Sequence, residues 1–361
     1  MVGLNILWFV LILVFLVLVH EAGHMVVAKW CGMRVERFSI FFGKPISSFR
    51  RGETEYGIGW LPLGGYVKIS GMTRGEETPP EVEGRAYYNM PAWKKIVTIA
   101  AGPAVNVILA IAIFAAIFWI GIPTARVTDT VGAVTQGQAA AQAGLQPGDR
   151  FVAIDDVRVN GDPERLRQRL LAGEPGDDVV LTLERDGRTI TRTAELQELN
   201  DAAGRRTGLG FTFEAVEGPT QQFGFVGGLR EGLDFTYYVI KANVEVFGDV
   251  FTSEQARDQV SSVVGVGAVF NEVSDDGLIT LLRFVGVISL ALGIFNMLPI
   301  LPLDGGHILF ALLEKAKGSP LSRTTYERAS FIGFALVMVV FVFALQNDIG
   351  RITGEGFQLN R

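Results

Sequence analysis

Residues 4–28 form an apolar run that is long enough to cross a bilayer, but a polar insert interrupts it near its C-terminal end. The insert places His20, Glu21 and His24 within little more than one helical turn. Each ionisable side chain at membrane depth costs on the order of 2.5–3.5 kcal/mol on insertion scales, so the three together require compensation. One alternative is a polar turn at the helix end, and another is a cleaved signal peptide over residues 1–28. The long apolar run without an early Lys or Arg disfavours a signal peptide.

Three further apolar segments are candidate membrane spans, and they cover residues 96–122, 278–313 and 331–345. The middle of the chain reads instead as an ordinary soluble domain. We therefore expect a multi-pass α-helical membrane protein with four transmembrane helices and an inserted α/β domain. The lipid bilayer is the expected surrounding. The formal net charge of −6, without a basic run, excludes nucleic acid as an expected partner.

Basic residues gather in the short loops on one side of this four-span topology. The positive-inside rule makes that side cytoplasmic, so both termini and residues 123–277 are expected outside. His20 lies roughly 24 Å along the helix from Leu4 at 1.5 Å per residue, which puts the polar insert nearer the cytoplasmic face. The basic residues that set the orientation are Lys29, Arg34, Arg37, Lys44, Arg50, Arg51, Lys94, Lys95, Lys315, Lys317, Arg323 and Arg328.

The polar insert has the pattern His-Glu-x-x-His. Residues four apart share one face of a helix, so the imidazoles of His20 and His24 can meet a single Zn²⁺. Glu21 stands beside them as the candidate general base that takes a proton from the water that zinc activates. Structural zinc binding releases roughly 10–16 kcal/mol in peptides, which is enough to offset the burial of three ionisable groups.

A catalytic zinc site needs a third protein ligand. Cys31 shares the His24 face but lies about 10 Å further along the helix axis, too far to join the same ion. Asp304 and His307 lie in an apolar segment that two prolines and a Gly pair interrupt. Irregular backbone at membrane depth is tolerated only where it is buried in protein or lines a wet cavity. The residues alone leave Asp304 and His307 as rival ligands, beside the simpler alternative of a cytoplasmic turn.

Three motifs, in this order, resemble those of the site-2 protease family of intramembrane zinc metalloproteases, and most closely its bacterial branch of regulator of sigma-E proteases. They are His-Glu-x-x-His in the first span, Gly-Pro-x-x-Asn at residues 102–106 and Asn-x-x-Pro-x-x-x-Leu-Asp-Gly-Gly at residues 296–306. The resemblance covers nearly the whole chain. It implies a Zn²⁺ cofactor held by His20, His24 and Asp304, with Glu21 as the catalytic residue. It also implies that Asn106 and Asn296 help to hold the substrate or the transition state.

The resemblance further implies a membrane-reentrant β-hairpin after the first span, matched here by residues 58–69 with Gly64, Gly65 and Tyr66 as substrate-binding residues. Physically this is a short strand broken by Pro and a Gly pair, and its edge could pair with an extended substrate segment. An ordinary hairpin on the cytoplasmic surface is the alternative. The family often has Gly-Pro-x-Gly-Ile before the third span, whereas residues 264–268 lack the proline, which puts the entry geometry of that span in question.

Residues from about 125 to 216 are expected to form one small α/β domain. The pattern predicts a short helix near residue 140, a strand at 151–154, a helix at 163–171 and a hairpin turn at Asp186-Gly187. This arrangement resembles a circularly permuted bacterial PDZ domain. Its carboxylate-binding loop would be Gly208, Leu209, Gly210 and Phe211, where Gly-rich backbone N–H groups converge on a peptide carboxylate. The alternative is a domain that only excludes bulky ectodomains from the protease and binds no peptide.

Apolar residues at helical spacing between 229 and 251 predict an amphipathic helix on the outer membrane interface, with a packing role or a gating role. The expected organisation is then a series of nine segments. They are the first transmembrane helix (1–30), a cytoplasmic-side region with the reentrant hairpin (31–93), the second transmembrane helix (94–122), the PDZ-like domain (123–217), the amphipathic region (218–277), the third transmembrane segment (278–314), a cytoplasmic loop (315–329), the fourth transmembrane helix (330–347) and a C-terminal tail (348–361).

The leading functional hypothesis is proteolysis within transmembrane segments. The resemblance implies substrates such as pre-trimmed anti-sigma factors and remnant signal peptides, and a location in the bacterial inner membrane with the PDZ-like domain extracytoplasmic. One alternative is a non-catalytic membrane PDZ scaffold with a structural zinc site, but such a site has no need of Glu21. A metal transporter is another, and the PDZ-like region and the lack of inverted repeats weigh against it.

Overall fold

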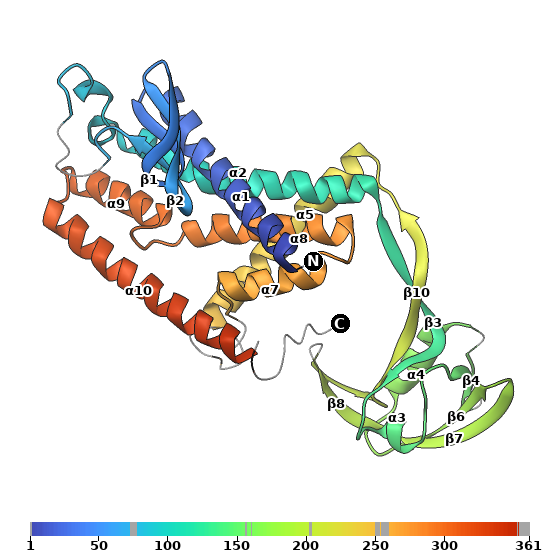
Figure 1. Ribbon diagram of the computed structural model, residues 1–361. Helices are drawn as coiled ribbons and strands as arrows, with labels where there is room; N and C mark the ends of the chain where they lie inside the picture. The colour runs from blue at the N-terminus through green and yellow to red at the C-terminus, as the bar shows by residue number, and fades with distance from the viewer. Residues whose placement is uncertain are drawn as a thin grey trace. The chain divides into compact units, whose positions relative to one another are not determined.

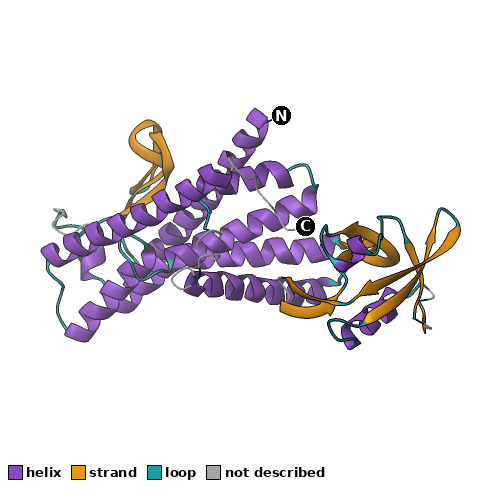
Figure 2. Cartoon of the chain, turned by 90° about the horizontal axis from the view of Figure 1, so that it is seen from below, coloured by secondary structure: helices purple, strands orange, loops and turns teal. Residues whose placement is uncertain are grey.

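The computed structural model divides into two compact units (Figure 1). The helical unit comprises Met1–Ile120 and Gln222–Arg361, and the inserted unit comprises Gly121–Gln221. Helices dominate the helical unit, whereas strands form most of the inserted unit (Figure 2). The residues that the structure describes are 2–72, 78–155, 157–159, 161–201, 204–249, 253, 260–351 and 353.

Four described helices are long and apolar enough to cross a membrane. The first extends the predicted span at 4–28 by two residues at each end, and the second begins four residues before the predicted span at 96–122 and stops two residues before its end. The third predicted span, 278–313, is divided into two helices by an irregular segment at 297–303. The fourth begins eight residues before the predicted residue 331, inside the expected cytoplasmic loop. These helices are α1 (Val2–Trp30), α2 (Ala92–Ile120), α8 (Leu278–Asn296), followed by the shorter α9 (Asp304–Lys317), and α10 (Arg323–Gly350).

Helix α2 lies at the centre of the helical unit and packs against α1, α5 (Phe225–Asp249), α8 and α9. Small residues bring α5 close to α2: a β-carbon at Gly232 would lie 2.7 Å from the backbone nitrogen of Ala115. Next to it, Phe114 and Phe235 make an edge-to-face contact at 4.8 Å between ring centroids. The predicted amphipathic helix therefore has a packing role along α2, and apolar side chains such as Leu233 remain exposed on its other side.

The predicted hairpin is a folded sheet built from two long strands, β1 (Val35–Arg51) and β2 (Thr54–Ile69). Residues 35–40 of β1 pair with residues 65–69 on one side and with residues 55–58 on the other. Residues 45–51 pair with residues 54–59 beyond them, so residues 65–69 form one edge of a four-ribbon arrangement. Where the strands cross, a β-carbon at Gly59 would overlap the carbonyl oxygen of Phe42, which only glycine permits. Two 3₁₀ turns, Glu83–Arg85 and Tyr87–Asn89, lie between this sheet and α2.

The irregular segment between α8 and α9 is packed inside the protein. β-Carbons at Gly305 and Gly306 would overlap backbone atoms of residues 297–301, so the Gly pair lets the start of α9 lie directly against this segment. Leu301 is buried. Non-helical backbone at membrane depth needs such an environment. Asp304 begins α9, where a carboxylate is favoured by the positive end of the helix dipole.

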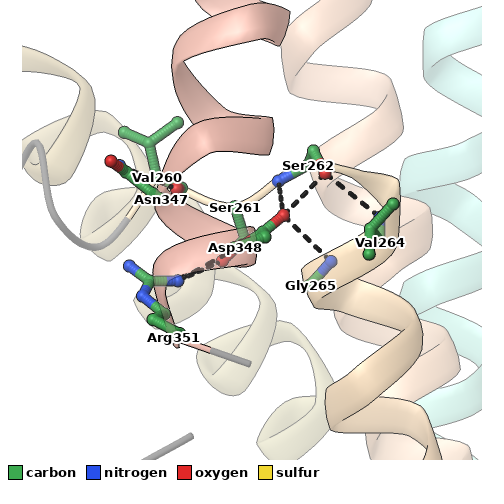
Figure 3. A network of polar contacts seen from close by, with 8 residues as sticks. All are labelled: Val260, Ser261, Ser262, Val264, Gly265, Asn347, Asp348 and Arg351. Carbon is green, nitrogen blue, oxygen red and sulfur yellow. Dashed lines mark hydrogen bonds and ion pairs between the residues drawn. The ribbon is translucent and has the colours of Figure 1, made fainter. Parts of the chain in front are cut away.

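A buried carboxylate joins the end of α10 to the start of α7 (Val263–Val273), as Figure 3 shows. Asp348 is fully buried and accepts hydrogen bonds from the backbone N–H of Ser262 at 2.7 Å, its hydroxyl at 2.6 Å and the N–H of Gly265 at 2.9 Å. A β-carbon at Gly265 would overlap this carboxylate. The side chain of Asp348 thus satisfies N–H groups that the first turn of α7 leaves unpaired. It belongs to α10, although the sequence pattern started the C-terminal tail there.

The inserted unit is built around a sheet with the strand order β10-β3-β4-β6-β7, with β5 paired to β4. The predicted turn is present: Asp186 and Gly187, both with positive φ, connect β6 and β7. The elements are β3 (Ile122–Val134), α3 (Ala139–Gln142), β4 (Arg150–Ile154), β5 (Val157–Arg158), α4 (Pro163–Ala172), β6 (Asp178–Arg185), β7 (Arg188–Glu195), the hairpin β8 (Gln197–Asp201) and β9 (Gly204–Gly208), and β10 (Phe211–Gln221).

One buried ion pair fastens a turn of the inserted unit to its sheet. The side chain of Asp149 is 1% exposed, contacts the Arg185 guanidinium at 2.6 Å and accepts the Gln146 N–H at 2.8 Å. Burial by itself would raise the pKa of the Asp149 carboxyl, but Arg185 and the Gln146 N–H outweigh it and hold that pKa below its ordinary value. The pair therefore links the stability of this unit to pH.

Candidate metal centre

The three predicted ligand residues meet although 280 residues of sequence separate His24 from Asp304. His20 and His24 point from one face of α1 toward the first residue of α9. The Nε2 atoms of the two histidines are 3.2 Å apart. Oδ2 of Asp304 is 3.1 Å from Nε2 of His20 and 3.4 Å from Nε2 of His24. Three donor atoms therefore form a nearly equilateral triangle.

This triangle fits a tetrahedral zinc ion. Zinc bonds of about 2.0–2.2 Å to nitrogen and oxygen place neighbouring ligand atoms about 3.3–3.5 Å apart, close to the three distances here. Among the described residues, Oδ2 of Asp304 is also a buried atom without a hydrogen-bond partner. A buried carboxylate oxygen without a donor is costly unless a cation satisfies it. Two neutral imidazoles and one carboxylate are a donor set that zinc accepts.

Helix α2 forms the wall behind the two histidines. Nδ1 of His24 lies 2.9 Å from the carbonyl oxygen of Thr98, and Nδ1 of His20 lies 3.3 Å from the side-chain amide of Asn106. Between these two contacts, Gly102 leaves room for both rings, because a β-carbon there would overlap Nε2 of His24. Sequence reasoning missed Thr98, since a backbone carbonyl has no signature in the residue type.

Glu21 lies beside the ligands and against the edge of the folded sheet. A β-carbon at Gly65 would be 3.3 Å from Cγ of Glu21, and the backbone N–H of Val67 faces the Glu21 carboxylate. The edge strand 65–69 therefore passes the candidate general base. Gly64, with a positive φ of 116°, turns the chain into this edge, and Tyr66 stacks on Phe42 at 5.2 Å between ring centroids. A cavity of about 640 Å³ lies between residues 66–72 and the start of α10.

The rival ligands lie elsewhere. Nδ1 of His307 is in hydrogen-bond contact with the hydroxyl of Tyr326 on α10, and His307 does not belong to the three-residue cluster found among the described residues. Cys31 is buried in an apolar cluster with Met33 and Ile69. The contact between His307 and Tyr326 was not predicted, because Tyr326 fell in the expected cytoplasmic loop.

Asn296 and the predicted peptide-binding loop make other contacts. Asn296 ends α8 and donates to the carbonyl oxygen of Leu292 at 3.0 Å. In the inserted unit, Gly208 ends β9, Leu209 is buried, Gly210 has a positive φ of 81° and Phe211 begins β10. The carbonyl oxygens of Leu209 and Gly210 accept hydrogen bonds from Ala140 and Thr135, so this loop is joined to the start of α3. Peptide binding by the loop stays a prediction.

Comparisons with known proteins point to one family. The sequence pattern of "Peptidase family M50" matches residues 8–340. A protein of Brucella suis biovar 1, named a zinc metalloprotease by inference, is 33% identical to this chain. The alignment covers 96% of this chain and 95% of that protein. Metalloprotease MmpA of Caulobacter vibrioides is 30% identical, over 93% and 92%. A PDZ domain of an SdrC-like protein from Listeria monocytogenes aligns with 26% of this chain and 93% of its own, at 20% identity and a TM-score of 0.21. The family pattern and the full-length relatives agree, and the chain belongs to peptidase family M50, the zinc metalloproteases.

Proposed function

We propose that this protein is a site-2-type intramembrane protease that hydrolyses peptide bonds in the transmembrane segments of other membrane proteins. The observation that carries the proposal is the triangle of His20, His24 and Asp304, which lies between two apolar helices with a carboxylate, Glu21, beside it. A structural zinc site has no use for such a carboxylate. A hydrolase requires it to move a proton.

Each residue has a distinct role in the proposed reaction. His20, His24 and Asp304 hold Zn²⁺, which when bound polarises the scissile carbonyl and lowers the pKa of water. Glu21 accepts a proton from the attacking water and later delivers it to the leaving amine. The backbone N–H of Val67 keeps the Glu21 carboxylate turned toward the sheet edge. The apolar helices around the site exclude bulk water.

Substrate presentation would use the edge strand 65–69. Peptide bonds of a transmembrane helix are shielded by their own hydrogen bonds, so the segment has to become extended before water can attack. An extended segment can add to this strand edge through main-chain hydrogen bonds, next to Glu21. Gly64, Gly65 and Tyr66 would line this path, and the cavity between the edge and α10 has room for the displaced chain.

The topology completes the proposal. The four spans would lie in a bacterial inner membrane with the basic loops in the cytoplasm. The inserted unit would then lie on the extracytoplasmic side. A PDZ-like unit there would bind a carboxylate at Gly208, Leu209, Gly210 and Phe211 or exclude bulky ectodomains. Either way, suitable substrates are already trimmed on the outside. Anti-sigma factors and remnant signal peptides have this character.

The decisive test replaces Glu21 with Gln in the purified full-length protein in detergent. We expect cleavage of a single-pass model substrate to fall at least 10³-fold while one zinc ion per chain stays bound, because proton transfer is lost and the ligands remain. Unchanged cleavage would overturn the role of Glu21. Stoichiometric zinc in both proteins, with no cleavage of any single-pass substrate by the wild type, would instead support a non-catalytic scaffold.

A further inference from the structure

Asn106 is a buried polar side chain next to the predicted ligands. It is fully buried on α2, and its amide nitrogen lies 3.3 Å from Nδ1 of His20. Its amide oxygen, Oδ1, is also buried and has no hydrogen-bond partner among the described residues. In this orientation an N–H faces the ring nitrogen and a carbonyl oxygen is left unsatisfied, which is an unfavourable arrangement for a buried amide.

Coordination through Nε2 decides how the amide must lie. A neutral imidazole that gives its Nε2 lone pair to a metal carries its proton on Nδ1, and that N–H needs an acceptor. A half-turn about the Cβ–Cγ bond of Asn106 brings Oδ1 to this position, since the amide oxygen and nitrogen occupy equivalent places. The half-turn supplies the acceptor that His20 requires and pairs the amide oxygen with the Nδ1 proton.

The second histidine shows the same arrangement. Nδ1 of His24 faces the Thr98 carbonyl, which can only accept a hydrogen bond, so His24 carries its proton on Nδ1 and presents a free lone pair at Nε2. Thr98 and Asn106 both belong to α2 and lie two turns apart, on either side of Gly102. One helix therefore offers an acceptor to each ligand histidine.

Helix α8 holds Asn106 in place. The hydroxyl of Ser289 donates to the main-chain carbonyl of Asn106 at 2.9 Å, and a β-carbon at Gly293 would lie 3.5 Å from Cβ of Asn106. Asn106 has no exposed surface that a substrate could contact, and its side chain is directed at the histidine ring.

We propose that Asn106 is a positioning residue of the metal centre: its Oδ1 accepts the Nδ1 proton of His20 and fixes this histidine in the tautomer that binds zinc through Nε2. This inference deepens the proposed function, because it rests on the same metal centre. The resemblance implied that the Asn of the Gly-Pro-x-x-Asn pattern helps to hold the substrate or the transition state. The inference instead assigns this Asn to the support of a metal ligand.

The test measures zinc affinity by competition with a chelator in the full-length protein, so that the result does not depend on catalysis. We expect Asn106→Leu to weaken zinc binding about 10–100-fold, the range seen when outer-shell partners of ligand histidines are removed. Asn106→Asp should stay within about threefold of the wild type, because a carboxylate also accepts the Nδ1 proton. Thr236→Ala, which removes a buried hydroxyl of α5 that donates to the carbonyl oxygen of Gly232, is the matched control and should bind zinc like the wild type.

Two results would overturn the inference. One is wild-type zinc affinity in Asn106→Leu together with a raised KM, which would make Asn106 a substrate residue. The other is equal weakening in Asn106→Asp and Asn106→Leu, which would make it a packing residue. Where Asn106→Leu does not fold, Asn106→Ala replaces it and is judged by the same criteria. Failure of the metal centre itself would give a different result: Asp304→Ala would bind zinc as tightly as the wild type.

Discussion

Gly102 of α2 lies directly against His24 of α1. A β-carbon at Gly102 would overlap Nε2 of His24 and lie 2.9 Å from Nε2 of His20. The candidate metal centre is therefore bounded by three helices: α1 and α9 carry the three predicted ligand atoms, and α2 closes the space behind them.

Gly102→Ala should strongly weaken zinc binding. The added methyl group occupies the space of the His24 ring, and the neighbour that would have to move is a ligand and not the end of a flexible side chain. We expect at least a 100-fold loss of zinc affinity, measured by chelator competition. Gly248→Ala in α5 is the matched control, since nothing lies within 4 Å of a β-carbon there. Tight zinc binding by Gly102→Ala would show that α1 and α2 are further apart than the structure has them.

The variants Asp304→Ala and His307→Ala should show which of these two residues is the third zinc ligand. Asp304→Ala removes one corner of the ligand triangle, so the bound zinc should fall from one ion per chain to nearly none after dialysis. His307→Ala loses the contact with Tyr326 on α10 but no atom of the triangle, and it should keep the ion. Metal content by atomic emission checks both variants. The reverse pattern would make His307 the third ligand.

Asp348→Asn should loosen α7. All three donors meet the same oxygen, Oδ2, so the amide oxygen of the variant can take its place as acceptor but without the negative charge. Hydrogen bonds to a charged group contribute about 1.5–3 kcal/mol each, against about 0.5–1.5 kcal/mol for neutral pairs. Hydrogen exchange of residues 262–273 should therefore become faster, by roughly 10–100-fold. Gln346→Ala, an exposed change on the same helix, should leave the exchange unaltered.

The inserted unit should lose stability in acid through Asp149. Because the folded-state pKa of this carboxyl lies below its ordinary value of about 3.9, its stabilising effect is fully present above that value. It is lost as the pH falls from about 4 through the folded-state pKa. At pH 7, Asp149→Asn should cost about 2 kcal/mol, discounted because the Arg185 side chain is 22% exposed.

Hydrogen exchange of residues 121–221 in the full-length protein checks this prediction. The ratio of exchange rates between Asp149→Asn and the wild type should be large at pH 7 and shrink toward one below pH 4. A ratio that does not change with pH would assign the effect to packing and not to charge.

Local patterns in the sequence were sufficient for part of the site. Helical spacing placed His20 and His24 on one face, and the long apolar runs predicted α1 and α2 within a few residues. The third ligand could not be chosen in this way. Asp304 and His307 are both polar residues in the same interrupted segment, and only the family resemblance distinguished them. The geometry that separates them, a ring turned toward Tyr326 and a carboxylate turned toward α1, depends on helix packing across the chain.

The pairing of strands β1 and β2 could not be predicted from local patterns either. Residues 58–69 were expected to form a short hairpin, and the structure instead folds two strands of 16 and 17 residues across each other. Strand pairing between residues 35–40 and two separate partners leaves no periodic signal in either partner. It becomes possible because Gly59 allows the backbones to cross closely, a contact that a sequence pattern records only as one more glycine.

The edge strand 65–69 has a consequence for selectivity under the proposed mechanism. A strand edge offers N–H and C=O groups, and every residue of an incoming chain carries the same complementary pair, so this surface discriminates poorly among side chains. The rate would then follow the free energy needed to unwind the incoming helix. A single Gly in place of Ala lowers that free energy by about 1 kcal/mol, close to a fivefold effect. The helix propensity of the incoming segment, more than the chemistry of its side chains, would therefore decide which membrane proteins are cleaved.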